Sequence, residues 1–123
     1  DEVGRGCFAG PAAVGAVVFP KNFKLNIKLA DSKLLTSKQR ENLNQIIKDV
    51  ALDWSVCEVS VLNINKSGIG KAIQDSFLEV LQKLKVVPVF VLIDAFIIKG
   101  FERFQRIQCR SAQRYDCNII SAQ

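Results

Sequence analysis

The sequence contains no histidine. This absence excludes serine–histidine triads, cysteine–histidine nucleophiles and imidazole metal sites. Any hydrolytic chemistry must therefore rest on carboxylates, lysines, hydroxyls or thiols. Carboxylates favour hard cations such as Mg²⁺ or Mn²⁺. The four cysteines include no Cys-x-x-Cys pair, so a structural zinc motif is missing as well.

Long apolar stretches are also missing. The longest runs, such as residues 86–93, are far too short to cross a bilayer, and the N-terminus has no basic-then-apolar signal pattern. Scattered cysteines beside a sizeable core are typical of reducing compartments, so the sequence predicts a cytoplasmic protein with no membrane segment. Its 123 residues suit one domain, and its net charge of +5 mildly favours a polyanionic partner.

The residues with the clearest chemical potential lie in the first six positions, whose sequence is Asp-Glu-Val-Gly-Arg-Gly. This order favours a strand end that carries two carboxylates, followed by a tight glycine loop. An arginine between glycines suits a phosphate, because its guanidinium donates two parallel hydrogen bonds. The segment therefore indicates a metal-assisted phosphodiester site. The alternative is a polar, frayed terminus.

Hydrophobic patterning predicts alternating strands and helices. The run at 12–19 is continuously apolar, so we expect a strand that is buried on both faces. Helical periodicity starts at Ser37, with Thr36 or Ser37 as the N-cap. The expected elements are a strand at 12–19, a helix at 37–50, a strand at 51–62, a helix from about 66 to 85 and a strand at 89–93.

This order of elements predicts an α/β fold, with a right-handed crossover from the strand at 51–62 to the strand at 89–93. Asp94 follows the last of these strands, at the sheet edge where α/β proteins place their ligands. A turn or N-cap aspartate is the alternative. If Asp94 lies near Asp1 and Glu2, their carboxylates repel unless a cation separates them.

These motifs occur together in one family. The sequence resembles ribonuclease HII, the prokaryotic type 2 ribonuclease H. Its signature corresponds to residues 1–6 and continues in Phe-Ala-Gly-Pro at 8–11. The segment Asp-Ser-Lys-Leu-Leu at 31–35 is similar to the family's Asp-Ser-Lys-x-Leu motif, and Leu-Ile-Asp-Ala at 92–95 follows in the family's order. The resemblance extends to about residue 100.

The resemblance implies a ribonuclease H-like α/β fold, a mixed β-sheet flanked by helices. It also implies an endonuclease that cleaves the RNA strand of RNA–DNA hybrids and single ribonucleotides embedded in duplex DNA. Residues 1–123 then form the catalytic domain, without most of the first strand and without the C-terminal helices. We expect this domain to be a monomer.

The same resemblance assigns the catalytic carboxylates. Asp1, Glu2 and Asp94 fill three matching positions, and Asp116 fills the fourth, with Tyr115 in place of the family's glycine. Together they are expected to hold two Mn²⁺ or Mg²⁺ ions. One ion would activate water and the other would stabilise the departing 3′ oxygen.

The resemblance also assigns the contacts with substrate. Gly4, Arg5 and Gly6 match the segment that contacts the ribose 2′-hydroxyl, and Lys33 matches a lysine near the nucleic-acid backbone. Two alternatives remain open. The chain is either a binding remnant with an incomplete metal site, or a partly folded fragment without activity.

Overall fold

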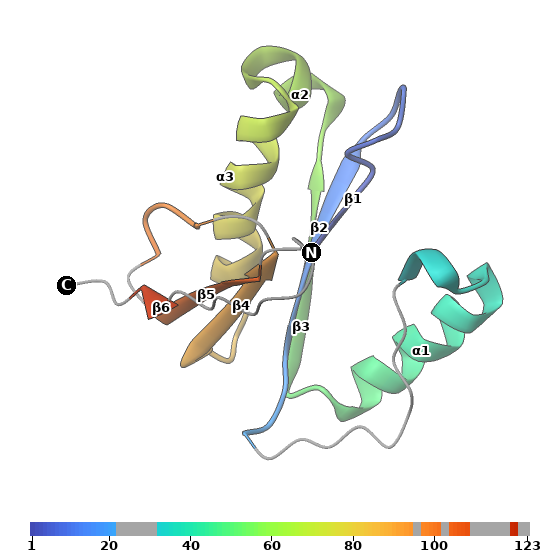
Figure 1. The fold of residues 1–123 in the computed structure, drawn as a ribbon, viewed down its shortest axis with the longest axis vertical. Coiled ribbons are helices and arrows are strands. Elements are labelled where there is room, and N and C mark those ends of the chain that lie inside the picture. The colour runs from blue at the N-terminus through green and yellow to red at the C-terminus, as the bar shows by residue number, and fades with distance from the viewer. Residues whose placement is uncertain (22–31, 95–96, 102–103, 109–118, 121–123) are drawn as a thin grey trace.

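The structure is a computed structural model that describes residues 1–21, 32–94, 97–101, 104–108 and 119–120. For Asp94, residues 104–108 and residues 119–120 it describes the backbone alone. In chain order the elements are β1 (Glu2–Val3), β2 (Ala12–Val18), the 3₁₀ helix η1 (Ser32–Leu34), α1 (Ser37–Val50), β3 (Asp53–Val59), α2 (Val61–Ser67), α3 (Ile69–Gln82), β4 (Phe90–Asp94), β5 (Phe104–Gln108) and β6 (Ile119–Ile120) (Figure 1).

The first sheet has the strand order β1-β2-β3 and is antiparallel throughout. Strand β2 pairs with β3 along its whole length, and its side chains alternate between the two faces. Val14 on the inner face is fully buried, whereas Val17 on the outer face is 39% exposed. The strand predicted at 12–19 is confirmed. The expectation that both of its faces are buried is wrong, because close packing covers the inner face alone.

Helix α3 covers this inner face and forms the centre of the core. The apolar residues of α3 recur at helical spacing, as the sequence predicted. A hydrogen bond also joins the helix to the sheet, because the side chain of Ser55 on β3 donates to the carbonyl of Val80 at 2.6 Å. The residues of α3 that are buried are Ala72, Ile73, Ser76, Phe77 and Val80.

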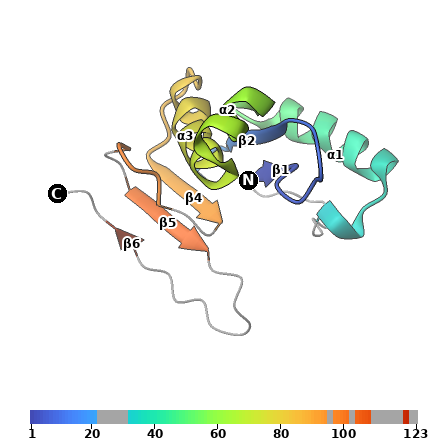
Figure 2. The ribbon, with the colours of Figure 1, turned by 90° about the horizontal axis from the view of Figure 1, so that it is seen from above.

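The second sheet has the order β4-β5-β6, with β4 and β5 parallel and β5 and β6 antiparallel. Val91 and Ile93 of β4 belong to the same core cluster as Val14 of β2, so the two sheets share one core (Figure 2). The predicted crossover within one sheet is wrong for the described strands, since β3 and β4 lie in different sheets. Strand β3 pairs with β2, and β4 pairs in parallel with β5.

Helix α1 begins as predicted, because the Thr36 hydroxyl accepts from the Gln39 amide while the Gln39 side chain accepts from the Thr36 amide. The helix lies on the side of the first sheet opposite α3 (Figure 1). Its apolar stripe contains no fully buried residue. Lys48 contacts the outer face of the sheet, where its ammonium lies 4.3 Å from the ring centroid of Trp54.

Helix α2 differs from the prediction. The sequence favoured a strand through residue 62, but β3 ends at Val59 and Ser60 caps a short helix by accepting from the Asn63 amide. Gly68, with φ of 78°, separates α2 from α3. Within the described chain, no helix combines the length and apolarity needed to span a membrane.

Candidate metal and nucleic-acid site

Asp1 and Glu2 form the edge of the first sheet. The amino group of Asp1 donates to the Gly15 carbonyl at 3.1 Å, and the Gly15 amide returns a 3.0 Å bond to the Asp1 carbonyl. The carboxylate of Asp1 accepts from the Glu2 amide at 3.1 Å. Glu2 lies opposite the buried Val14 and is partly buried, whereas Asp1 is exposed. Successive residues of an extended chain point to opposite faces of a sheet. The carboxylates of Asp1 and Glu2 can therefore bind the same ion only if that ion lies outside the sheet, next to the edge that β1 forms.

A tight turn follows β1 directly. The Cys7 amide donates to the Gly4 carbonyl at 3.2 Å, which closes the turn over residues 4–7. Gly4 has φ of 91°, and a Cβ at this position would lie 2.9 Å from the carbonyl oxygen of Pro11. Both facts require glycine. Gly6 is less constrained, because a Cβ there would meet nothing within 4 Å.

The turn directs Arg5 back toward the carboxylates. Its guanidinium Nη1 lies 3.6 Å from Oε1 of Glu2, and the Arg5 side chain is 47% exposed against 16% for Glu2. The acidic group and the phosphate-binding group that the sequence predicted are therefore brought together.

Asp94 reaches the same region from a distant part of the chain. It is the last residue of β4, and the arrowhead end of β4 lies beside the N-terminus in both views (Figures 1 and 2). Buried Val91 and Ile93 anchor this strand in the core. The side chain of Asp94 and the whole of Asp116 lie outside the described residues, so their part in the site remains a prediction.

Lys33 belongs to a different element. It lies in η1 and is exposed. Sequence reasoning missed the residue that holds this turn, Arg40, whose guanidinium donates to the carbonyls of Ser32 and Leu35 at 3.3 and 2.6 Å. An arginine in the first turn of a helix, just after the Asp-Ser-Lys motif, is the signal that could have revealed it.

The predicted metal ligands are all carboxylates, which is the donor chemistry that Mg²⁺ and Mn²⁺ prefer. Among the described side chains, no group of three or more histidine, cysteine, aspartate or glutamate residues could hold a metal ion. Asp1 and Glu2 are the two described members of the predicted set. Their oxygen donors fit such an ion, and the remaining ligands would have to come from Asp94 and Asp116.

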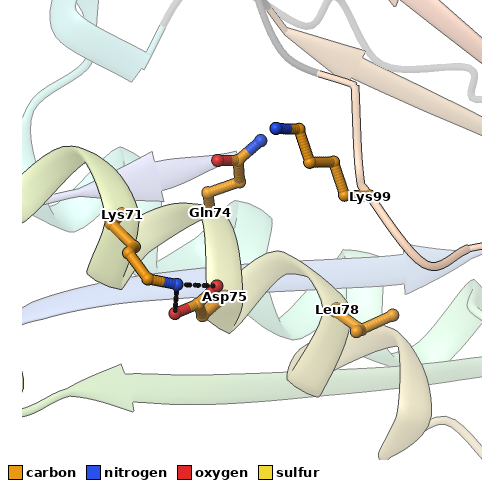
Figure 3. Close-up of a pocket in the computed structure, with 5 residues that line it drawn as sticks. All are labelled: Lys71, Gln74, Asp75, Leu78 and Lys99. Carbon is orange, nitrogen blue, oxygen red and sulfur yellow. Dashed lines mark hydrogen bonds and ion pairs between the residues drawn. The ribbon is translucent and has the colours of Figure 1, made fainter. Parts of the chain in front are cut away.

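A surface pocket of about 370 Å³ lies away from these residues, on α3 (Figure 3). Lys71 in this pocket pairs with Asp75 at 2.9 Å. The Gln74 side chain donates to the Ile97 carbonyl at 3.3 Å, while Lys99 and Leu78 complete the lining. The ion pair neutralises one of the two lysines, so this pocket shows no strong preference for an anion.

The groups with clearly shifted pKa values cluster where α3 meets β3. Burial raises the pKa of the Cys57 thiol, and the nearby Glu79 side chain adds to this effect. A hydrogen bond from Lys83 is the main cause that lowers the pKa of Glu79. Cys57 belongs to the core, whereas Glu79 and Lys83 form a half-exposed ion pair, and none of the three is part of the candidate site.

Comparison with known families identifies the family of the chain and its fold. The family model of ribonuclease HII matches residues 1–121, which include every predicted carboxylate. The chain belongs to the ribonuclease HII family. Both the resemblance and the α/β, ribonuclease H-like fold are thereby confirmed.

Individual relatives agree with this assignment. Ribonuclease HII of Clostridium acetobutylicum is 39% identical over 104 residues, which are 81% of this chain and 41% of that protein. Ribonuclease HII of Prochlorococcus marinus strain NATL2A is 34% identical over 119 residues, 94% of this chain and 61% of that protein. The crystal structure of ribonuclease H2 from Pyrococcus horikoshii OT3 has a TM-score of 0.76 at 26% identity, and the match covers 89% of this chain and 60% of that chain. The chain thus spans about two fifths to three fifths of the length of these relatives.

Proposed function

We propose that this chain carries the catalytic region of a metal-dependent endoribonuclease. The substrate is an RNA–DNA hybrid, or duplex DNA that contains a single ribonucleotide, and the cleaved bond is a phosphodiester of the RNA strand. The observation that carries the proposal is the ribonuclease HII family match over residues 1–121, and the end of β4 lies near the N-terminus in both views of the fold (Figures 1 and 2).

The carboxylates would hold two divalent ions. Glu2 and Asp1 would bind from the edge of β1, and Asp94 and Asp116 would complete the set. When bound, such a pair of ions supplies Lewis-acid stabilisation of charge and a water of lowered pKa. The chain's own contribution would be to fix Glu2 on β1 and Asp94 at the end of β4, which reduces reorganisation during the reaction.

The turn after β1 would hold the substrate. Gly6 has no side chain on the open side of the turn, where a Cβ would meet nothing within 4 Å, so a sugar–phosphate backbone can approach closely there. The Arg5 guanidinium, adjacent to Glu2, would donate to a phosphate oxygen beside the scissile bond. Gly4, Arg5 and Gly6 would contact the ribose 2′-hydroxyl, which is the group that distinguishes RNA from DNA. Such a protein recognises sugar and shape rather than base sequence.

The test is cleavage of an end-labelled DNA duplex that contains one ribonucleotide, with Mg²⁺ or Mn²⁺ and with chelator. We expect a metal-dependent cut on the 5′ side of the ribonucleotide and no cut in an all-DNA duplex. Asp94→Asn should abolish cleavage while the chain still unfolds cooperatively. Asp49→Asn, the same chemical change on the exposed face of α1, should cleave at the parent rate. Parent-rate cleavage by Asp94→Asn would show that the site assignment is wrong.

The alternative function is that of a chain that binds nucleic acid without cutting it, which its net charge of +5 supports. Salt-sensitive binding without cleavage is the expected result, because Lys and Arg contacts with phosphates release counterions. The free thiols of Cys7 and Cys57 support the cytoplasm as the compartment in either case. We propose a monomer as the working state.

A further inference from the structure

The turn that carries Lys33 is built onto the first turn of α1. The Leu35 amide donates to the Ser32 carbonyl at 3.3 Å, which closes η1. The capping box of Thr36 and Gln39 then fixes the start of the helix. Lys33 therefore has a defined place relative to the axis of α1.

Arg40 joins the two elements. Its Nη1 donates to the Leu35 carbonyl at 2.6 Å and to the Ser32 carbonyl at 3.3 Å, and its Nη2 donates to the Ser37 hydroxyl at 3.2 Å. A planar guanidinium can hold several acceptors in fixed directions, which an ammonium cannot. One side chain thus holds both ends of the turn that contains Lys33.

The core does not hold this turn. None of its three residues is buried, and Leu34 is 79% exposed. Helix α1 also has no buried residue. Because hydrophobic packing contributes little here, the geometry of η1 depends strongly on local hydrogen bonds. Loss of the Arg40 bonds should therefore loosen the turn without unfolding the core.

We propose that Arg40 is a positioning residue, which fixes the turn so that Lys33 can contact a phosphate of the nucleic acid. The inference rests on the proposed function. Arg40 does not itself contact the substrate in this account, since its two terminal nitrogens already donate to the protein. Its effect on binding passes through Lys33.

The two residues should consequently not act independently. Arg40→Ala and Lys33→Ala should each raise the dissociation constant for a duplex with one ribonucleotide by about tenfold, the order expected for one charge-assisted hydrogen bond. The double variant should bind no more weakly than Lys33→Ala alone. Arg40→Lys should fall between the parent and Arg40→Ala, because an ammonium can replace only part of the guanidinium contacts.

Lys38→Ala is the matched control. Lys38 lies in the same helical turn as Arg40 and carries the same charge, and its side chain makes no hydrogen bond or ion pair with other described residues. Its loss should change binding by less than twofold, within the effect of one distant surface charge. The salt dependence of binding separates these roles further. Lys33→Ala and Arg40→Ala should each reduce the slope of the logarithm of the binding constant against the logarithm of the salt concentration by about the amount that corresponds to one phosphate contact. Lys38→Ala should leave this slope unchanged.

The experiment measures fluorescence anisotropy of the labelled duplex in chelator with the full 123-residue chain, together with amide hydrogen exchange at Leu35. Arg40→Ala should accelerate exchange at Leu35, whereas Lys33→Ala should not. Two results would overturn the inference. One is that the effects of Arg40→Ala and Lys33→Ala on binding add up in the double variant. The other is that Arg40→Ala binds the duplex as tightly as Lys38→Ala does. If the unsubstituted chain neither binds nor cuts, the proposed function itself fails, and the inference fails with it.

Discussion

At the scale of single residues, Asp53 joins the start of β3 to the loop after α3. Its Oδ2 accepts from the amides of Lys85 and Val86 at 2.6 and 2.9 Å, and its Oδ1 accepts from the Trp54 amide at 2.9 Å. These bonds, the one from Val86 foremost, lower the pKa of Asp53 below its usual value of 3.8. One carboxylate thus satisfies three backbone donors that would otherwise depend on water.

This lowered pKa predicts the sign of a pH effect. Because the folded pKa is below the unfolded one, the stabilisation is present above the unfolded pKa, near 3.8, and is lost as pH falls through the folded value. Asp53→Asn should lower the urea midpoint at pH 7 and should flatten its dependence on pH below about 4. Urea titrations at pH 7 and pH 3 provide the measurement, with Asp49→Asn as the control. An unchanged midpoint at pH 7 would contradict this role.

At the scale of elements, the glycine turn predicts a contrast between two substitutions. Gly4→Ala places a Cβ 2.9 Å from the Pro11 carbonyl at φ of 91°, and should destabilise the fold by about 1 to 3 kcal/mol. Gly6→Ala meets open space at an ordinary φ and should be nearly neutral. Thermal unfolding of both variants provides the comparison. Equal losses would show that the turn has a different conformation from the one described.

The elements also show how far sequence patterns suffice. The helix at 37–50 and the strand ending at Asp94 are predictable, because capping residues and a buried run define them locally. Helix α2 is not, since Val61 and Leu62 continue the apolar pattern of β3 and only Ser60 indicates a cap. The burial of β2 on one face was also unpredictable, because small apolar residues fit a half-exposed strand as well as a fully covered one.

At the scale of the whole molecule, the candidate site depends on the proximity of β1 and the end of β4, which no local pattern encodes. The composition and the Asp-Glu pair indicated carboxylate chemistry. The resemblance to a family then assigned the further carboxylates, Asp94 and Asp116. The shared core brings β2, the neighbour of β1, together with β4, since Val14 and Ile93 belong to one cluster. The separation of β3 and β4 into two sheets could not be deduced, because hydrogen-bond partners of strands are set by tertiary packing.

This arrangement predicts that divalent ions stabilise the whole fold. If the carboxylates of Asp1, Glu2 and Asp94 face one another as proposed, they repel until a cation binds, so Mn²⁺ should raise the thermal midpoint of the parent chain. At a hundredfold excess over its dissociation constant the ion would add about 2.7 kcal/mol, which is several degrees for a domain of this size. Asp94→Asn should lose this increment, and its metal-free midpoint should equal or exceed that of the parent.

Asp49→Asn should keep the full increment, because its carboxylate lies on α1 and accepts a hydrogen bond from Gln45 rather than facing the site. Differential scanning calorimetry with chelator and with Mn²⁺ separates the two contributions without any substrate. An equal increment in the parent, Asp94→Asn and Asp49→Asn would mean that the ion binds elsewhere on the surface. A loss confined to Asp94→Asn would link the end of β4 to the metal, since that strand is joined to β1 through the core.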